Sequence, residues 1–95
     1  MENFNYKKIA QFLKALSHPT RLLIVQELMK NKKCVNDIEE ILELRQPNIS
    51  QHLNLLRLSN VVDFKQDGNK KCYFLKDPKL IKNLFDILKN LNNVS

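Results

Sequence analysis

The stretch of twelve residues from Gln46 to Arg57 constrains this chain more than any other, because its two faces need different surroundings. Apolar residues at the spacing that lines one side of a helix are Ile49, Leu53 and Leu56. The opposite side carries amide and hydroxyl groups, at Gln46, Ser50, Gln51 and Asn54. Such groups suit hydrogen bonding to base edges in a DNA major groove, although a solvated polar face on an ordinary helix explains them too.

The overall composition narrows the class of protein. A length of 95 residues with 43% hydrophobic residues fits a single domain, residues 1–95, around one core. The net charge of +6 favours polyanionic partners, nucleic acid before a membrane surface. The chain has no apolar run that could span a bilayer and no secretory pattern, so we expect a cytoplasmic protein without a membrane partner. It offers no nucleophile–base pair and no phosphate-binding glycine loop, so we expect neither an enzyme nor a cofactor.

Three helical patterns precede the two-faced stretch. The apolar period predicts helices over residues 4–16, 19–30 and 35–44, with Pro19 in the first turn of the second. Only Leu44 and Arg45 separate the third helix from the two-faced stretch. Two helices joined by so short a turn cross steeply, which is the helix-turn-helix arrangement.

A β-hairpin is predicted next. Two strand patterns, 61–66 and 70–75, flank Gly68, the only glycine in the chain, so we expect a tight reversal with positive φ there. Lysines near its tip are Lys65, Lys70 and Lys71. They would reach phosphates or the adjacent minor groove, unless they only protect an edge strand from aggregation.

The first and last helices are more apolar than a small core requires. The first carries a broad apolar stripe, and the last begins at Asp77 and Pro78 and is nearly half apolar. We therefore expect part of each to pack against a second subunit, the alternative for the last being a buried core helix.

The order of these elements is that of a winged helix-turn-helix, mainly α with a small β-hairpin, and three local strings sharpen it. Residues 15–22, ALSHPTRL, are similar to the entry motif of the arsenical-resistance repressor (ArsR/SmtB-type) family. Residues 46–53 resemble that family's recognition helix, and Asp67-Gly68 with Tyr73-x-Leu75 resembles its wing. The resemblance covers about residues 9 to 85. It implies a homodimeric repressor, paired through its first and last helices, that leaves a palindromic double-stranded DNA operator when a signal binds.

The resemblance also assigns residues to DNA. Positions where the family reads or touches bases are held by Gln46, Pro47, Ser50 and Gln51, with Asn48 in the same string and Asn54 further along the same face. Expected phosphate contacts are Arg57, Lys65, Lys70 and Lys71. His52 borders the apolar face, which favours a structural hydrogen bond over base contact, and His18 is expected to start a helix.

The metal sites of the family are not complete in this sequence. The arsenic-type sensors resembled here use Cys-Val-Cys at the start of the third helix, and this chain has Cys34-Val35-Asn36. Of four ligands expected for a zinc sensor, only Asp77 is present. We therefore expect no metal site.

The two cysteines leave several alternatives open. A reducing compartment would keep Cys34 and Cys72 as thiols by default. Cys34 would cap the third helix after two lysines, a setting that favours its thiolate and thus oxidation, persulfidation or soft-ion binding. In winged helices the segment before this helix can pair with the second wing strand, so a Cys34–Cys72 bond within one subunit is conceivable. Alternatively both are packing residues, and the protein is a regulator without an inducer or a protein-interaction module.

Overall fold

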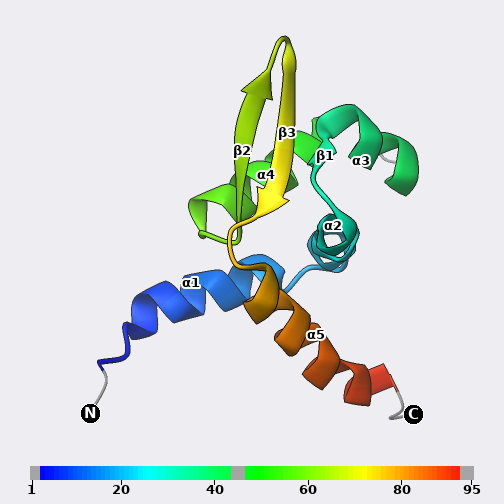
Figure 1. The fold of residues 1–95 in the computed structure, drawn as a ribbon. Coiled ribbons are helices and arrows are strands. Elements are labelled where there is room, and N and C mark those ends of the chain that lie inside the picture. The colour runs from blue at the N-terminus through cyan, green and yellow to red at the C-terminus, as the bar shows by residue number, and fades with distance from the viewer. Residues whose placement is uncertain (1–2, 44–46, 93–95) are drawn as a thin grey trace.

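The computed structural model describes residues 3–43 and 47–92, which form five helices and a small sheet (Figure 1). The elements in order are α1 (Tyr6–Leu16), α2 (Pro19–Lys30), β1 (Lys33–Cys34), α3 (Val35–Leu42), α4 (Asn48–Leu58), β2 (Val62–Asp67), β3 (Lys70–Leu75) and α5 (Pro78–Asn92). Helices α3 and α4 form the helix-turn-helix, and β2 and β3 project beyond them as the wing. This confirms the winged helix-turn-helix predicted from the sequence.

The ends of the first two helices follow from their caps. Helix α1 begins at Tyr6 rather than Phe4, because the Asn5 side chain accepts a hydrogen bond from the Lys8 backbone N–H at 3.1 Å. Helix α2 has the predicted bounds. His18 caps it as expected, with Nδ1 accepting from the Thr20 backbone N–H at 3.1 Å.

Helix α3 is shorter than predicted. It ends at Leu42, because Glu43 adopts the left-handed conformation with φ 53° and cannot continue the helix. Helix α4 starts at Asn48, with Pro47 as its N-cap residue. Leu44, Arg45 and Gln46 lie outside the described residues.

The sheet has three antiparallel strands in the order β1-β3-β2, one more than the predicted hairpin. Asp67 pairs with Lys70, so Gly68 and Asn69 alone make the turn, and Gly68 has the expected positive φ of 62°. Asn60 is also left-handed, at φ 65°, where α4 gives way to β2. The two residues of β1 pair with the edge of β3 that is opposite β2, and they thereby join the start of α3 to the wing.

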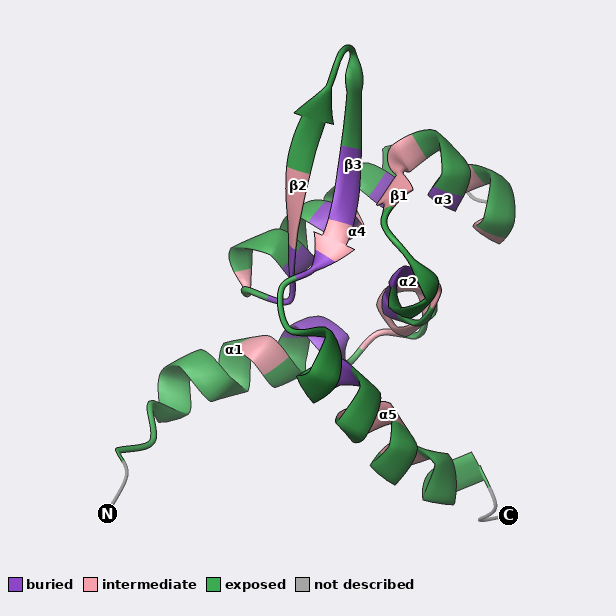
Figure 2. Ribbon diagram, viewed as in Figure 1, coloured by how far each residue is buried: buried purple, intermediate pink, exposed green. Residues whose placement is uncertain are grey.

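The core lies where α2, α4 and the base of the sheet meet (Figure 2). The inward residues of α4, Ile49, Leu53 and Leu56, are completely buried, as their spacing predicts. They pack with buried residues of the neighbouring elements, including Ile24, Val25, Ile38, Val62 and Ile81. Burying one face of α4 in this way fixes which side chains it presents outward. Among the described residues, no helix has the length and hydrophobicity needed to cross a membrane.

Candidate nucleic-acid interface

The outer face of α4 presents the polar residues that the sequence singles out. Because Ile49, Leu53 and Leu56 point into the core, the other side of the helix faces solvent. Ser50, Gln51 and Asn54 are all exposed there. Pro47 and Asn48 are exposed at the start of the helix. The uncharged side chains on this face can donate and accept hydrogen bonds without the cost of stripping water from a charge.

A groove of about 440 Å³ lies between α4, the start of α3 and the hairpin. We call it the helix–wing groove; its lining residues are Cys34, Val35, Asn36, Ser50, Asn54, Gln66, Asn69, Lys70, Lys71 and Tyr73. It therefore brings together two of the expected base readers and two of the expected phosphate contacts. Gln51, Arg57 and Lys65 are exposed outside this lining.

The charge of the helix–wing groove favours anions. Lys70 and Lys71 line it, and the described part of its wall contains no Asp or Glu. The nearby Asp37 carboxylate accepts a hydrogen bond from the Cys34 backbone N–H at 3.2 Å, at the N-terminus of α3. A wall with two cations and several amide and hydroxyl groups matches the phosphate and sugar edge of a nucleic acid.

An aromatic ring that the sequence analysis did not single out organises the cations next to this groove. Arg57 Cζ lies 5.3 Å and Lys71 Nζ 4.8 Å from the centre of the Phe64 ring, within cation–π range. Phe64 also contacts the Tyr73 ring, with 5.5 Å between centroids. Burial raises the pKa of Tyr73, with the Arg57 charge opposing the shift. The available signal was a single aromatic residue on β2, half-buried and opposite a strand that begins with two lysines.

His52 joins α4 to the preceding helices rather than to solvent. Its Nδ1 lies 3.3 Å from Nη1 of Arg21, whose Nε donates to the Ala15 carbonyl at 2.5 Å. Because a guanidinium can only donate, His52 Nδ1 is the acceptor and the neutral ring carries its proton on Nε2. Burial lowers the pKa of His52, and the neighbouring His18 and Arg21 lower it further. The structural hydrogen bond expected for His52 is confirmed.

The two cysteines form a disulfide bond. Cys34 on β1 lies directly opposite Cys72 on β3, with their Cα atoms 3.7 Å apart. The default expectation of two free thiols is therefore wrong for this structure, because strand pairing brings the two residues together. Cys34 is also the N-cap residue of α3, as expected, and Cys72 is buried. The bond thus ties the start of the helix-turn-helix to the wing.

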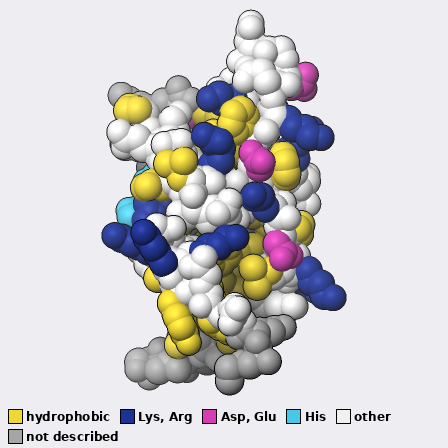
Figure 3. Space-filling view, turned by 90° about the vertical axis from the view of Figure 1, so that its left-hand side faces the viewer, with side chains coloured by type: hydrophobic (Ala, Val, Ile, Leu, Met, Phe, Trp, Pro, Cys, Tyr) yellow, Lys and Arg dark blue, Asp and Glu magenta, His cyan; other side chains and the backbone are white. Residues whose placement is uncertain are grey.

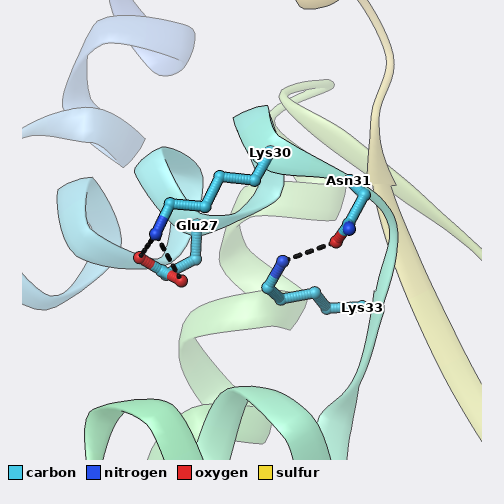
Figure 4. Close-up of polar contacts among 4 residues, drawn as sticks. All are labelled: Glu27, Lys30, Asn31 and Lys33. Carbon is cyan, nitrogen blue, oxygen red and sulfur yellow. Dashed lines mark hydrogen bonds and ion pairs between the residues drawn. The ribbon is translucent and has the colours of Figure 1, made fainter.

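Of the two lysines before Cys34, Lys33 makes a hydrogen bond to another residue. Lys33 Nζ donates to Asn31 Oδ1 at 2.6 Å, back toward the end of α2 (Figure 4). In the same view Lys30 Nζ contacts the Glu27 carboxylate at 3.0 Å. The Lys33–Asn31 hydrogen bond thus lies within the segment that leads from α2 into Cys34, and the Lys30–Glu27 ion pair lies in the last turn of α2. In the described ranges no three His, Cys, Asp or Glu residues are grouped so that they could hold a metal ion.

Comparisons with known proteins agree with this geometry. Residues 18–63 match the family model described as bacterial regulatory protein, arsR family. An uncharacterised HTH-type transcriptional regulator of Methanocaldococcus jannaschii is 37% identical over 79% of this chain and 85% of its own length. The HTH-type transcriptional repressor SmtB of Mycobacterium tuberculosis is 34% identical over 80% of this chain, a match that spans 56% of the repressor.

A solved structure extends the likeness to the whole fold. HlyU from Vibrio cholerae superimposes with a TM-score of 0.81 at 30% identity, over 95% of this chain and 97% of HlyU. The matched family region runs from the start of α2 into β2 and so contains the recognition helix. Fold, recognition helix and relatives agree, and the chain belongs to the arsR family of bacterial regulatory proteins.

Proposed function

We propose that this DNA-binding transcriptional repressor acts as a homodimer on a palindromic operator, with α4 in the major groove. The observation that carries the proposal is the helix–wing groove, which sets Ser50 and Asn54 of α4 beside Lys70 and Lys71 of the wing. Residues 1–95 then supply one DNA-binding domain with its own dimer helices. Such a protein works in the cytoplasm with the DNA, as a regulator and not as an enzyme.

The polar face of α4 supplies the sequence selectivity in this proposal. Amide side chains such as those of Gln51 and Asn54 can pair with the two hydrogen-bonding atoms of an adenine edge, and a Ser hydroxyl accepts or donates to several bases. Pro47 and Asn48 belong to the same proposed contact, at the N-terminal end of α4, which enters the major groove first. Gln46, which lies outside the described residues, is included in this contact on the sequence motif alone. The complete burial of Leu53 and Leu56 supports the proposal because it fixes the rotation of α4.

Affinity comes from the cations. In the proposed complex Lys70 and Lys71 face the DNA phosphates that pass between α4 and the wing. Arg57 contacts the DNA backbone near the end of α4, and Lys65 lies on β2 at the edge of the sheet. Each phosphate neutralised by such a residue releases counterions, so binding should weaken steeply with salt on every duplex.

The proposed dimer uses the outer faces of α1 and α5. Large apolar side chains are exposed to solvent on these faces, with Leu13 49%, Ile87 67% and Leu91 67% exposed. A strongly apolar groove of about 340 Å³ also lies between these helices, beside Ile9 and Leu80. Apolar side chains are visible between basic ones in the lower half of Figure 3. A second copy would cover this surface and set the two α4 helices roughly 34 Å apart, the spacing of successive major grooves.

A thiol-directed signal releases the operator in this proposal, and it acts at the Cys34–Cys72 pair. The bond joins the N-cap of α3 to β3, so its state changes how firmly the helix-turn-helix is held to the wing. A regulator that responds to no ligand remains the alternative.

Footprinting of the protein on its own upstream DNA, followed by fluorescence anisotropy with that duplex and a scrambled one, tests the proposal. We expect Gln51→Ala to reduce the difference in binding free energy between the operator duplex and the scrambled duplex by about 1–3 kcal/mol. Lys70→Ala should weaken binding to both duplexes alike and reduce the salt slope by about one unit.

The matched control is Lys82→Ala, which removes the same charge from α5. It should leave both affinities unchanged. Two other results would instead favour a protein-interaction module whose basic face is incidental. These are equal affinity of the parent protein for the two duplexes, and no loss of DNA affinity in Lys70→Ala.

A further inference from the structure

The disulfide between Cys34 and Cys72 presents its two residues unequally. Cys72 is 1% exposed and packed in the sheet, whereas Cys34 is half-buried and lines the helix–wing groove. Thiol–disulfide exchange begins when a thiolate reaches one of the two sulfurs, so access decides which is attacked. Only Cys34 lies where a small molecule in the groove can approach it.

We propose that Cys34 is an S-thiolation site for an anionic low-molecular-weight thiol, and that this adduct and DNA compete for the helix–wing groove. The inference rests on the proposed function, because it takes the groove as part of the DNA interface. It names the chemical class of the thiol signal and the place where that signal acts.

The exchange balances without an added oxidant. The thiolate of the small molecule attacks the Cys34 sulfur, forming a new S–S bond. The Cys34–Cys72 bond breaks, and its electron pair leaves on the Cys72 sulfur, which takes up a proton. One disulfide replaces another, and the products are a mixed disulfide at Cys34 and a buried Cys72 thiol.

The groove selects an anionic thiol by its size and charge. Its volume of about 440 Å³ is that of an ordinary small-molecule site. Lys70 and Lys71 are its charged lining residues within the described part of the chain, so a thiol that carries carboxylates is attracted and a cationic thiol is repelled. Amide and hydroxyl groups of Asn36, Ser50 and Asn54 offer further hydrogen bonds.

The adduct and DNA would occupy the same space in the helix–wing groove and bind the same lysine side chains. A molecule bonded to Cys34 fills the space between α4 and the wing, and its carboxylates occupy the lysines that DNA phosphates need. Opening the disulfide also removes the covalent link between the N-cap of α3 and β3. Since coupling between two ligands is reciprocal, an adduct that weakens DNA binding implies that DNA opposes formation of the adduct.

The selectivity is tested with the oxidised protein and two probes, glutathione and the cationic thiol cysteamine, at equal thiolate concentration. Intact-mass spectrometry with peptide mapping follows the mixed disulfide. We expect glutathione on Cys34, formed at least about fivefold faster than the cysteamine adduct at low salt. Lys70→Gln with Lys71→Gln should remove this preference, and Lys82→Gln should keep it. An adduct mainly on Cys72, or equal rates for the two probes, would overturn the assignment.

The competition is tested by adding duplex DNA at low salt, with its binding monitored by anisotropy in the same samples. Saturating duplex should slow glutathionylation at least about tenfold, and the isolated adduct should bind the duplex at least about tenfold more weakly. Cys34→Ser protein lacks the bond and should form no adduct, so it should bind the duplex more tightly than the adduct does, and any loss relative to the parent measures the bond alone. If the duplex binds but leaves the rate unchanged, the inference fails while the proposed function stands. If unmodified protein binds no duplex at all, the proposed function fails, and the competition with it.

Discussion

The guanidinium carbon of Arg57, one residue before the end of α4, lies 5.3 Å from the centre of the Phe64 ring on β2. The Lys71 ammonium lies 4.8 Å from the same ring. One aromatic side chain thereby ties the recognition helix to the wing and holds two cations in place before a ligand arrives. This arrangement differs from a set of independent surface lysines, because the cations lose less conformational freedom on binding.

Replacing Phe64 by Leu should therefore weaken DNA binding although the protein keeps all its charges. The two freed side chains must be ordered again, at a cost of about 1 kcal/mol or somewhat more, which is roughly a fivefold loss of affinity on any duplex. The salt slope should stay unchanged, whereas Lys71→Ala should lower it by about one unit. Phe64→Tyr, which keeps the ring, should bind like the parent protein in the same anisotropy titration. Equal losses for Tyr and Leu would rule out a role for the ring.

Acid should destabilise the protein through His52. Its pKa is lowered in the folded state, so the unfolded chain binds this proton more readily and stability falls as the pH drops below about 6.5. Above that pH the contribution is fully present. Protonation would set His52 against Arg21 and His18, its charged and titratable neighbours. Urea melts between about pH 7.5 and 5.5 should show the loss, and His52→Asn, which retains an acceptor near Nδ1, should flatten it. An equally steep decline in the Asn variant would assign the effect to another group.

The wing turn depends on the backbone of Gly68 rather than on space around it. A Cβ atom added there would meet nothing within 4 Å, but φ is +62°. Gly68→Ala should thus destabilise the fold by about 1–2 kcal/mol through conformation alone. Gly68→Asn should cost less, since Asn tolerates this region. Thermal denaturation compares them, with Asn69→Ala as the neighbouring control. A Gly68→Ala protein as stable as the parent would contradict the argument.

A charge placed on the outer faces of α1 or α5 should separate the proposed dimer. Leu13→Glu and Ile87→Glu alter side chains that are 49% and 67% exposed in the single chain, so neither should unfold the subunit. Light scattering after gel filtration should report the mass of one chain for both variants and of two for the parent. Ile41→Glu on α3, 47% exposed, is the matched control and should remain dimeric. Dimeric Leu13→Glu and Ile87→Glu proteins would place the interface elsewhere.

The features that could be predicted from the sequence are those fixed within a few residues. Helix α2 has its predicted bounds because Pro19 and His18 define its start locally. The rotation of α4 follows from the spacing of three apolar residues, and the turn at Gly68 follows from its chemistry. The order of helices and hairpin followed from the same local patterns, and the resemblance to one family sharpened it into a winged helix-turn-helix.

The features that were missed depend on contacts between distant segments. The two-residue β1 has no periodicity of its own, so its pairing with the edge of β3 could be anticipated only as a general option of winged helices and not from the residues. The ring of Phe64 finds its cations only when the register of β2 against β3 and the end of α4 are known. The left-handed Glu43, which ends α3 early, carries no residue-type signal of the kind that Gly provides.

The Cys34–Cys72 bond has a topological consequence. It closes a loop with a sequence separation of 38 residues, and α3, α4 and β2 all lie inside that loop. The recognition helix is therefore part of a covalent ring. After a protease cuts once inside the ring, the disulfide still joins the two fragments into one molecule. The fragments separate only when a thiol opens the bond.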